Sequence, residues 1–442
     1  MPERVSPERS AHPVLFLILF LPLGVSNGYV VVTLAYLMAA AGIGVDAIAT
    51  LAAWSLAPQT WKVLGGPLVD TTLTNKAWYA ISAVVTGLLM TATAIIPLSA
   101  ATIGLITILV FIFSTATGFN ALAADSIMAH ATVPEEKGRA GGWSQAGNLG
   151  GSGIGGGLGL WLSQHGSPGW FQHAGHWLAQ HTAIGGFADA GLWASQHITA
   201  GTMAGGSLGI LVALSALVLP LVHEPPDEHP DHSFAQSIVS VGKDAWSLMR
   251  SRMGLLAIVA MSLPISVGAM TNLWSAVAGD WRASADWVAL VNGALGGVIS
   301  MFGCIIGGWL CDKMDRKLAF NLFSLIVCVC ALAMAIAPRT QQMFIVFVCV
   351  YQFLTGLCYA AFGAVVLEAI GKGAAATKYN LLASLANVPI IYLTKIDGWA
   401  HSAWGATGML LTEAAVPVLG TLIFVVFAVV TRPLYKNRAA AS

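Results

Sequence analysis

Long runs of apolar residues, separated by short polar connections, fill most of the chain. A run of about 20 apolar residues can cross the hydrocarbon core of a bilayer as a helix. Twelve such runs lie near 13–38, 46–69, 78–97, 101–125, 141–163, 202–222, 254–277, 287–311, 318–337, 342–367, 379–394 and 408–431. The pattern predicts an all-α, multi-pass membrane protein with twelve transmembrane helices.

The composition excludes several other classes of protein. Of the 442 residues, 57% are hydrophobic and 9% are Asp, Glu, Lys or Arg, whereas soluble domains carry about 25% charged residues. Twenty basic residues balance 20 acidic ones, so there is no basic surplus for nucleic acid. The six cysteines lie in or beside apolar runs and are interpreted as buried small hydrophobes. We therefore expect the lipid bilayer and a small molecule as partners, with no nucleic acid, metal or cofactor.

The distribution of lysine and arginine predicts the orientation. The two chain ends and every second connection hold 16 of these residues, whereas the opposite connections hold only Arg282, Arg339 and Lys395. Cytoplasmic loops carry the excess of positive charge in membrane proteins. This asymmetry places both termini in the cytoplasm.

A polar stretch divides the apolar runs into two sets of six, and an offset of 242 positions superimposes landmarks of the two sets. Pro22 falls on Pro264, Gly66–Asp70 falls on Gly308–Asp312, and Asp125 falls one residue from Glu368. Parallel repeats of this kind occur in transporters. The predicted units are a six-helix bundle over 13–222, a cytoplasmic linker over 223–253, a second six-helix bundle over 254–431, and an extended outer loop over 164–200.

The outer loop contains three similar heptapeptides, Gly159–His165, Gly175–His181 and Gly191–His197, at a spacing of 16 residues. Breaks at Ser167–Gly169 and Gly185–Gly186 predict two short helices at the outer interface with tryptophans inward. The loop is either a lid over the cavity or a duplicated filler hairpin.

One charged motif follows the eighth apolar run. Gly307 and Gly308 precede Asp312, which is followed by Arg316 and Lys317. The string resembles the G-x-x-x-D-x-x-x-R-[RK] loop signature of the major facilitator superfamily. Small residues let membrane helices approach closely, and Asp312 can bind a helix N-terminus or pair with Arg316. The first half of the chain holds a shorter copy of this motif at Gly66–Asp70, which no arginine follows. The two copies together predict a conformational latch made of Gly66, Asp70, Gly308, Asp312 and Arg316.

Two stretches narrow the resemblance over about residues 24–160. Pro58–Asp70 reads P-Q-T-W-K-V-L-G-G-P-L-V-D, and Asp125 is followed by V-P-E-E-K-G at Val133–Gly138. Both are similar to stretches of the AmpG-type muropeptide permeases and acetyl-CoA transporters. The resemblance implies transport of a muropeptide or an acyl-CoA-like solute.

Lys62 lies within an apolar run, where a lysine costs about 2.5–3.5 kcal/mol at the bilayer centre. Its counterpart at the 242-residue offset is Cys304, so the repeated scaffold does not need a charge there. Lys62 is either a counter-charge for an anionic substrate, a partner of a titrating carboxylate, or a lysine that snorkels to the headgroups.

Three ionisable residues are candidates for proton coupling or gating: Asp125, His130 and Glu413. Asp125 precedes His130 by five residues, and an acid beside a histidine can exchange protons. A gate pair of Asp125 with Lys62 or Arg139 is the alternative. Glu413 has no charged neighbour in the sequence, whereas Asp397 is interpreted as an interfacial partner of Lys395.

The superfamily resemblance implies a cavity lined by the first, fourth, seventh and tenth helices. Its candidate polar walls, besides Lys62, are Asn27, Tyr29, Asn120, Asn272, Tyr351 and Gln352, with Gln59 and Asn387 from neighbouring helices. Each one could instead make a hydrogen bond between helices. As a set, they suit a polar solute.

These features together predict a secondary active transporter rather than an enzyme. No nucleotide-binding loop of the Walker type appears, and every histidine falls in a predicted loop or near a membrane end. We expect a monomeric, proton-coupled importer of a polar, anionic solute in a bacterial inner membrane, working by alternating access. Muropeptides, peptides, acyl-CoA-like molecules and siderophores all remain as substrates. The alternative is a passive facilitator or a proton-antiport exporter of the same fold.

Overall fold

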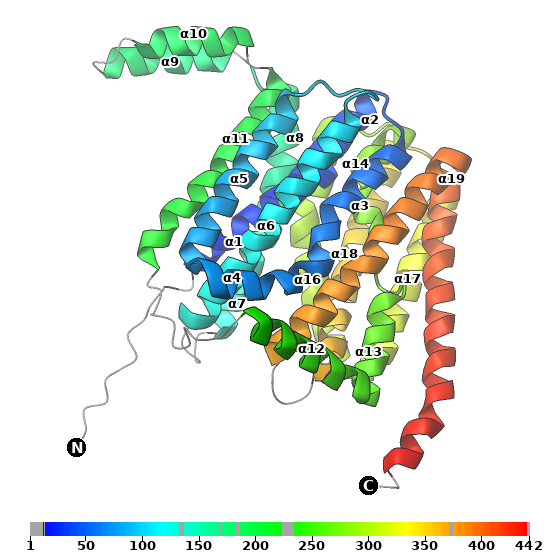
Figure 1. The fold of residues 1–442 in the computed structure, drawn as a ribbon. Helices are drawn as coiled ribbons and strands as arrows, with labels where there is room; N and C mark the ends of the chain where they lie inside the picture. The colour runs from blue at the N-terminus through cyan, green and yellow to red at the C-terminus, as the bar shows by residue number, and fades with distance from the viewer. Residues whose placement is uncertain are drawn as a thin grey trace, which may run out of the picture.

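The computed structural model describes residues 12, 14–131, 137–167, 169–182, 186–197, 199–222, 234–370 and 375–439, and all regular elements in these ranges are helical. Most long helices run side by side along one direction and form a bundle (Figure 1). The start of α1 and the end of α19 lie at one end of the bundle, here called the terminal end. The hairpin of α9 and α10 stands at the opposite end, here called the hairpin end.

The bounds of the elements before residue 223 are α1 Leu15–Gly28, η1 Tyr29–Leu34, α2 Ala35–Ala40, α3 Val45–Trp61, η2 Lys62–Gly65, α4 Gly66–Thr72, α5 Asn75–Ile95, α6 Ile103–Ala131, α7 Lys137–Gly153, η4 Ile154–Leu158, α8 Gly159–His165, α9 Gly169–His181, α10 Gly186–His197, α11 Ala200–Leu214 and η5 Ser215–Leu221. In this part α1 packs against α7, and α5 packs against both α6 and α11.

The bounds of the later elements are α12 Phe234–Arg250, α13 Arg252–Ser262, η6 Ala269–Asn272, α14 Trp274–Val277, η7 Ala278–Trp281, α15 Ala285–Val288, η8 Ala289–Ala294, α16 Leu295–Cys311, α17 Arg316–Ile336, α18 Gln341–Ile370 and α19 Ala375–Ala439. Here α16 packs against α18, and α17 packs against both α18 and α19. Contacts of α3 with α19 and of η4 with η8 join the earlier and later helices.

Short polar side chains start several of the helices. The Ala77 amide donates to Thr74 Oγ1 at 3.2 Å before α5, and the Leu318 amide donates to Asp315 Oδ1 at 2.9 Å before α17. A capping oxygen satisfies one of the backbone N–H groups that a helix leaves without a partner at its start. The polar connections between the apolar runs therefore fix where the helices begin.

Eight helical segments of the described residues are long and apolar enough to cross a membrane. The last of them, Lys378–Arg432, contains two helices joined by a kink at Gly405, where φ is 68°. These eight segments hold nine of the twelve predicted spans. The other three, at 46–69, 141–163 and 254–277, are not among these segments, and a count of twelve stays a prediction.

The predicted span at 254–277 is not one continuous helix. Helix α13 ends at Ser262, and the chain passes Pro264 before Ser266 and Gly268 adopt φ of 57° and 61°. The residue before a proline is pushed out of the helical region, and Leu263 is extended with ψ of 154°. In this broken segment the Ser266 amide donates to Ser324 Oγ of α17 at 2.9 Å.

The predicted connection between the last two spans is also helical. Helix α19 continues past residue 394 to the kink at Gly405, so Asp397 lies inside a helix. Asp397 is fully buried, whereas Lys395 is exposed. The expected interfacial pair of Lys395 and Asp397 is therefore wrong, because a spacing of two residues puts the side chains on different sides of a helix.

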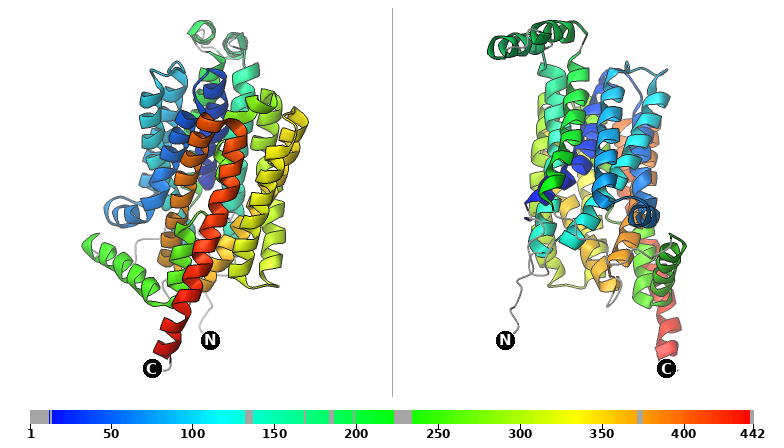
Figure 2. Two further views of the ribbon diagram at one scale, coloured as in Figure 1. Left: turned by 90° about the vertical axis from the view of Figure 1, so that its right-hand side faces the viewer. Right: turned by 60° about the vertical axis from the view of Figure 1, so that its left-hand side comes forward.

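The outer-loop prediction of two short helices is confirmed by α9 and α10. They pair with each other as an antiparallel hairpin that projects sideways from the bundle (Figures 1 and 2). Trp177 and Trp193 are 58% and 60% exposed, so they do not pack inward on the bundle as expected. Trp177 stacks on His181 instead, with ring centroids 4.3 Å apart.

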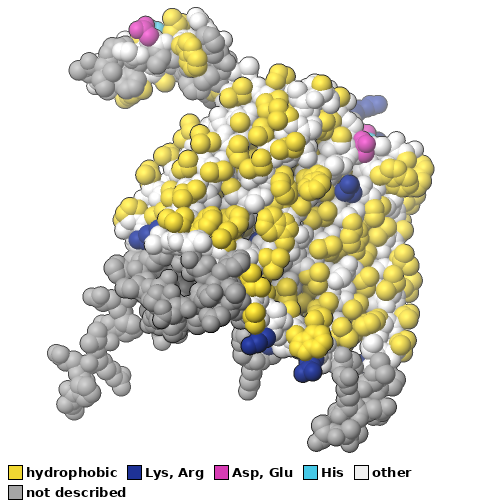
Figure 3. All heavy atoms as spheres, viewed as in Figure 1, with side chains coloured by type: hydrophobic (Ala, Val, Ile, Leu, Met, Phe, Trp, Pro, Cys, Tyr) yellow, Lys and Arg dark blue, Asp and Glu magenta, His cyan; other side chains and the backbone are white. Residues whose placement is uncertain are grey.

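The lateral surface of the bundle is apolar. Figure 3 shows hydrophobic side chains over most of the face in view, with few charged groups among them. Large apolar residues along the helices, such as Leu88, Ile305 and Val430, are more than 60% exposed. Soluble proteins rarely expose continuous apolar surface of this extent, and lipid tails are its natural solvent.

Close packing of α16 and α18 depends on Gly356. A Cβ at this position would overlap the carbonyl of Ser300 and lie 2.9 Å from the Cys304 nitrogen, whereas Gly363 on the same helix has open space. Overpacking a well-packed interior costs about 1–3 kcal/mol. We expect Gly356→Val to lower the unfolding temperature in detergent clearly, while Gly363→Val changes it little. Equal shifts in the two variants would show that this crossing does not limit stability.

Candidate substrate cavity

Two polar cavities lie side by side within the bundle. The larger has a volume of about 220 Å³, and its polar lining includes Asn27, Gln59, Lys62, Asn148 and Asn387. The smaller has a volume of about 130 Å³ and is lined by Asn27, Asn272, Asn292, Gln352 and other residues. Since Asn27 lines both, the two cavities adjoin, and they draw side chains from the earlier and the later helices.

Six of the nine predicted cavity residues line these cavities: Asn27, Gln59, Lys62, Asn272, Gln352 and Asn387. The amides are only lightly engaged elsewhere. Asn272 donates to Thr394 Oγ1 at 3.1 Å, and Asn387 donates to the Ala383 carbonyl at 3.0 Å. An amide has two donors and an acceptor, so hydrogen-bonding capacity is left for a ligand.

The other three predicted cavity residues make hydrogen bonds between helices. Tyr29 is buried and its hydroxyl lies 3.1 Å from Thr93 Oγ1, Asn120 donates to the Tyr79 carbonyl at 3.2 Å, and Tyr351 donates to Glu413. Tyr29 follows Asn27 by two residues, about 200° around a helix, so the two side chains leave in opposite directions.

Asn148 and Asn292 were missed as cavity residues. Asn148 lies in the glycine-rich α7 and Asn292 in the π turn η8. Asn292 Nδ2 donates to Ser275 Oγ at 2.9 Å, and its carbonyl oxygen has no partner in the described residues. An amide within an apolar run is itself a signal, because polar residues in membrane helices face the interior.

Lys62 is the cation of the larger cavity. It lies at the start of η2, where α3 gives way to a tighter turn before Pro67. Asp125 of α6 is half-buried and lies within electrostatic reach of Lys62, yet the described residues contain no ion pair of Lys62 within 4 Å. Lys62 therefore adds a positive charge to the lining of the larger cavity, and Asp125 is a counter-charge beyond ion-pair distance.

The structure describes only some of the other acidic and histidine side chains that were predicted to act in coupling or gating. The side chains of His130 and Asp70 lie outside the described residues. Glu413 is buried, lines neither polar cavity, and accepts a hydrogen bond from Tyr351. Asp397, which was expected at an interface, faces Glu413.

A third cavity of about 130 Å³ is mainly apolar. Met261, Phe320 and Phe362 contribute to its wall. It shares Asn387 with the larger polar cavity and Tyr359 with the smaller one. An apolar lobe thus adjoins the two polar cavities.

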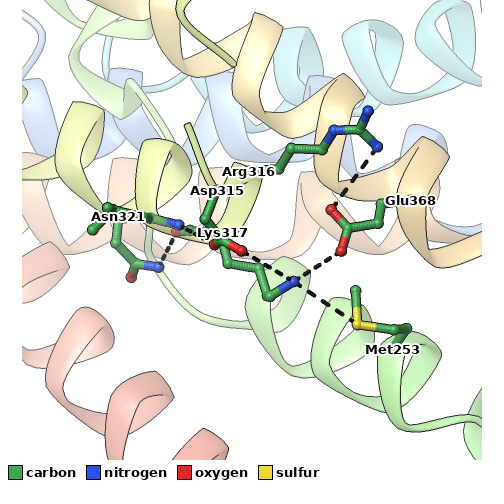
Figure 4. A network of polar contacts seen from close by, with 7 residues as sticks. Met253, Asp315, Arg316, Lys317, Asn321 and Glu368 are labelled. Atoms are coloured by element: carbon green, nitrogen blue, oxygen red, sulfur yellow. Dashed lines mark hydrogen bonds and ion pairs between the residues drawn. The ribbon is translucent and has the colours of Figure 1, made fainter. Parts of the chain in front are cut away.

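The charged motif after α16 forms a network different from the predicted one. Arg316 and Lys317 at the start of α17 reach Glu368 near the end of α18, with Nη1–Oε2 and Nζ–Oε1 distances of 3.9 Å and 2.9 Å (Figure 4). Asp315 lies 3.7 Å from Lys317 Nζ. Asp312 is exposed and takes part in no ion pair among the described residues. Of the two roles expected for Asp312, the pair with Arg316 does not form, because Arg316 pairs with Glu368 instead.

The two latch glycines do not bring helices together. A Cβ at Gly66 or Gly308 would meet nothing within 4 Å, whereas one at Gly307 would lie 2.9 Å from Leu357 Cα. Gly307, not Gly308, therefore allows the close approach of α16 to α18. Glu368 was missed in the network, although its match to Asp125 at the repeat offset marked it.

We expect Glu368→Gln to lower the stability of this network by about 1 kcal/mol, since Glu368 is 29% exposed and partly screened by solvent. The unfolding temperature in detergent should fall, and high salt should reduce the difference from the wild type. Asp312→Asn, in the loop between α16 and α17, is the matched control and should change nothing. A larger effect at Asp312 than at Glu368 would contradict the network.

The comparisons with known proteins agree with this architecture. The family model for the Major Facilitator Superfamily matches residues 14–393. A search of curated protein sequences found no match. Among solved structures, a bacterial homologue of the human lysosomal transporter Spinster, inward-facing and unoccupied, has a TM-score of 0.68 at 16% identity and covers 97% of each chain.

Two further structures are similar in fold. A D-xylose–proton symporter has a TM-score of 0.65 at 14% identity and covers 93% of this chain and 96% of its own. The nucleoside transporter NupG has a TM-score of 0.62 at 13% identity and covers 93% of this chain and 98% of its own. At such identities the likeness concerns the fold alone. Together with the family match over most of its length, it shows that this chain belongs to the Major Facilitator Superfamily of membrane transporters.

Proposed function

We propose that the protein is a proton-coupled importer of a polar, anionic solute that works by alternating access. The observation that carries this proposal is Lys62, which lines the larger polar cavity without an ion-pair partner among the described residues. An ammonium group in a low-dielectric cavity attracts a carboxylate or phosphate far more strongly than it does in water. The amides of Asn27, Gln59 and Asn387 supply the hydrogen bonds that orient the solute.

The substrate that fits these cavities carries an anionic group, several hydrogen-bonding groups and an apolar part. Lys62 binds the anion, the amides bind the polar groups, and the adjoining lobe near Phe320 and Phe362 takes the apolar part. Muropeptides and acyl-CoA-like molecules have this composition, and the AmpG-type stretch Pro58–Asp70 supports them. Peptides and siderophores meet the same chemical requirements only in part.

The membrane arrangement proposed with this function has two six-helix bundles, at 13–222 and 254–431, and both termini in the cytoplasm. The excess of lysine and arginine at the terminal end of the bundle supports cytoplasmic termini. The backbones of Gly157 in η4 and Gly293 in η8 touch where the earlier and later helices cross. A crossing between small residues lets two bundles rock against each other with little steric hindrance. We propose a monomer in a bacterial inner membrane.

A passive facilitator or a proton-antiport exporter of the same fold is the alternative. The buried carboxyl groups of Asp397 and Glu413 favour coupling, because a facilitator has no need to retain costly buried acids. One proton that enters down about 100–150 mV releases about 2.3–3.5 kcal/mol, enough for accumulation of about 50- to 400-fold.

Uptake into proteoliposomes tests the proposal. Labelled muropeptide, acetyl-CoA and dipeptide are offered with and without an imposed inward proton gradient. The importer should accumulate at least one anionic probe only when the gradient is present. Equal uptake in both conditions would support the facilitator, and efflux driven by the gradient would support the exporter.

A further inference from the structure

Two acidic side chains are buried together where α19 folds back at Gly405. Asp397 precedes the kink and Glu413 follows it, and their exposed fractions are 0% and 1%. Their carboxyl groups face each other. Among the described residues, the Tyr351 hydroxyl is their only hydrogen-bond donor outside the pair, and both Asp397 oxygens and Glu413 Oε2 lack any other partner.

No cation compensates this pair in the described part of the chain. His401, one turn beyond Asp397, bonds to Asp280 at 2.6 Å instead. The thiols of Cys328 on α17 and Cys358 on α18 lie within electrostatic reach of Glu413, and Lys395 of α19 is exposed. None is a cation in contact with a carboxyl group.

Two ionised carboxylates cannot remain side by side in such a place. Burying one charge without a partner is costly, and a second like charge adds repulsion in a low dielectric. The pair must therefore hold at least one proton in the arrangement seen. The Tyr351 hydroxyl then donates to the oxygen that keeps the negative charge.

The pair lies directly behind the smaller polar cavity. Asn272, which lines that cavity, donates to Thr394 of α19, one turn before Asp397. Gln352, which also lines it, is the neighbour of Tyr351 on α18, and Trp274 packs edge-on against Tyr351 with centroids 5.2 Å apart. A change in the positions of the two acids can therefore move residues of the cavity wall. Gln352 would move with α18, and Asn272 would move with the broken segment after Pro264.

We propose that Asp397 and Glu413, with Tyr351 as hydrogen-bond donor, form the site that binds and releases the proton coupled to transport. This inference rests on the proposed function. The proton joins a carboxylate oxygen from water on one side and leaves the same oxygen to water on the other. Loss of the proton leaves two repelling charges on the two arms of α19, which favours a change at the Gly405 kink and at Asn272.

Infrared spectroscopy of the purified protein tests the site without any substrate. A protonated carboxyl group has a distinct C=O stretching band, which we expect at neutral pH in the wild type. The double variant Asp397→Asn/Glu413→Gln should lose this band, and the control Asp46→Asn should keep it. A wild type without the band, or a double variant that retains it, would overturn the inference.

Two further arms keep the test decisive. If the double variant does not fold, the single variant Glu413→Gln replaces it, because glutamine has the shape of the protonated acid. This variant should shift the pH at which the band disappears. An unchanged titration of the band would count against the site. Replacing choline chloride by sodium chloride should leave the band unaltered. Loss of the band in sodium chloride would show that the pair binds Na⁺ instead of a proton.

The transport consequence separates this inference from the proposed function. With labelled muropeptide or acetyl-CoA, Glu413→Gln should retain exchange between equal pools and lose accumulation driven by the gradient. A wild type that shows the infrared band but no gradient-driven uptake would refute the proposed coupling and leave the protonated pair in place. A Glu413→Gln variant that accumulates as the wild type does would refute the assignment of coupling to the pair.

Discussion

Lys62→Ala should abolish uptake of an anionic solute and weaken its binding by about 10- to 150-fold. That range corresponds to the loss of a charge-assisted hydrogen bond of about 1.5–3 kcal/mol. Lys62 supplies the positive charge of the larger cavity, and its neighbours in the wall, Gln59 and Asn387, cannot replace a charge. Calorimetry on the purified protein and uptake by proteoliposomes measure the two effects.

Two variants make this result specific. Lys62→Arg should rescue only partly, because the guanidinium is longer, planar and forked and so misplaces the contact. Lys395→Ala removes an exposed lysine of α19 and should leave binding unchanged. Normal binding and uptake in Lys62→Ala would reduce Lys62 to a lysine that reaches for headgroups.

Asp125→Asn should abolish net accumulation while exchange between equal pools continues. In the empty protein Asp125 is the counter-charge of Lys62, and an anionic solute takes over that role when it binds. Without Asp125 the empty cavity retains an uncompensated lysine, which makes the return of the empty carrier costly. Because Asp125 no longer competes with the anion for Lys62, the anion should bind several-fold more tightly to Asp125→Asn than to the wild type.

Asp125→Glu, which keeps the charge, should restore part of the accumulation, and Asp46→Asn should have no effect. The measurement compares counterflow with gradient-driven uptake in the same proteoliposomes. Intact accumulation in Asp125→Asn would show that Lys62 needs no counter-charge. Loss of exchange together with accumulation would instead place Asp125 in substrate binding.

The helices could be predicted from the sequence wherever one long apolar run makes one helix. The runs at 78–97, 318–337 and 342–367 match α5, α17 and α18 closely. The run at 254–277 was wrongly predicted as one helix, because it is apolar on both sides of the break at Pro264. Asp397 was predicted at the membrane interface for the converse reason, since its charge and that of Lys395 interrupt the apolar run in a segment that stays helical up to Gly405.

The cavity could be predicted in outline. A polar side chain in an apolar run must face the protein interior, and Asn27, Gln59 and Asn387, selected on this ground, line the larger cavity. The same argument cannot separate a cavity wall from a bond between two helices, and Tyr29 and Asn120 make such bonds. That distinction depends on which helix lies opposite.

The buried acids and the ion-pair network depend on contacts distant in the sequence. Glu413 meets Tyr351 across 62 positions, and Lys317 meets Glu368 across 51. No spacing rule within one helix connects such pairs. Only the repeat offset hinted at Glu368, through its match to Asp125.

We propose that entry of an anionic solute through the Lys62 cavity carries protons with it. A pH-sensitive dye inside proteoliposomes, with labelled muropeptide or acetyl-CoA added outside, measures this directly. The solute should acidify the lumen as it enters through the wild type, and Lys62→Ala should show neither entry nor acidification. Entry of the solute with no change in luminal pH, or with alkalinisation, would contradict it.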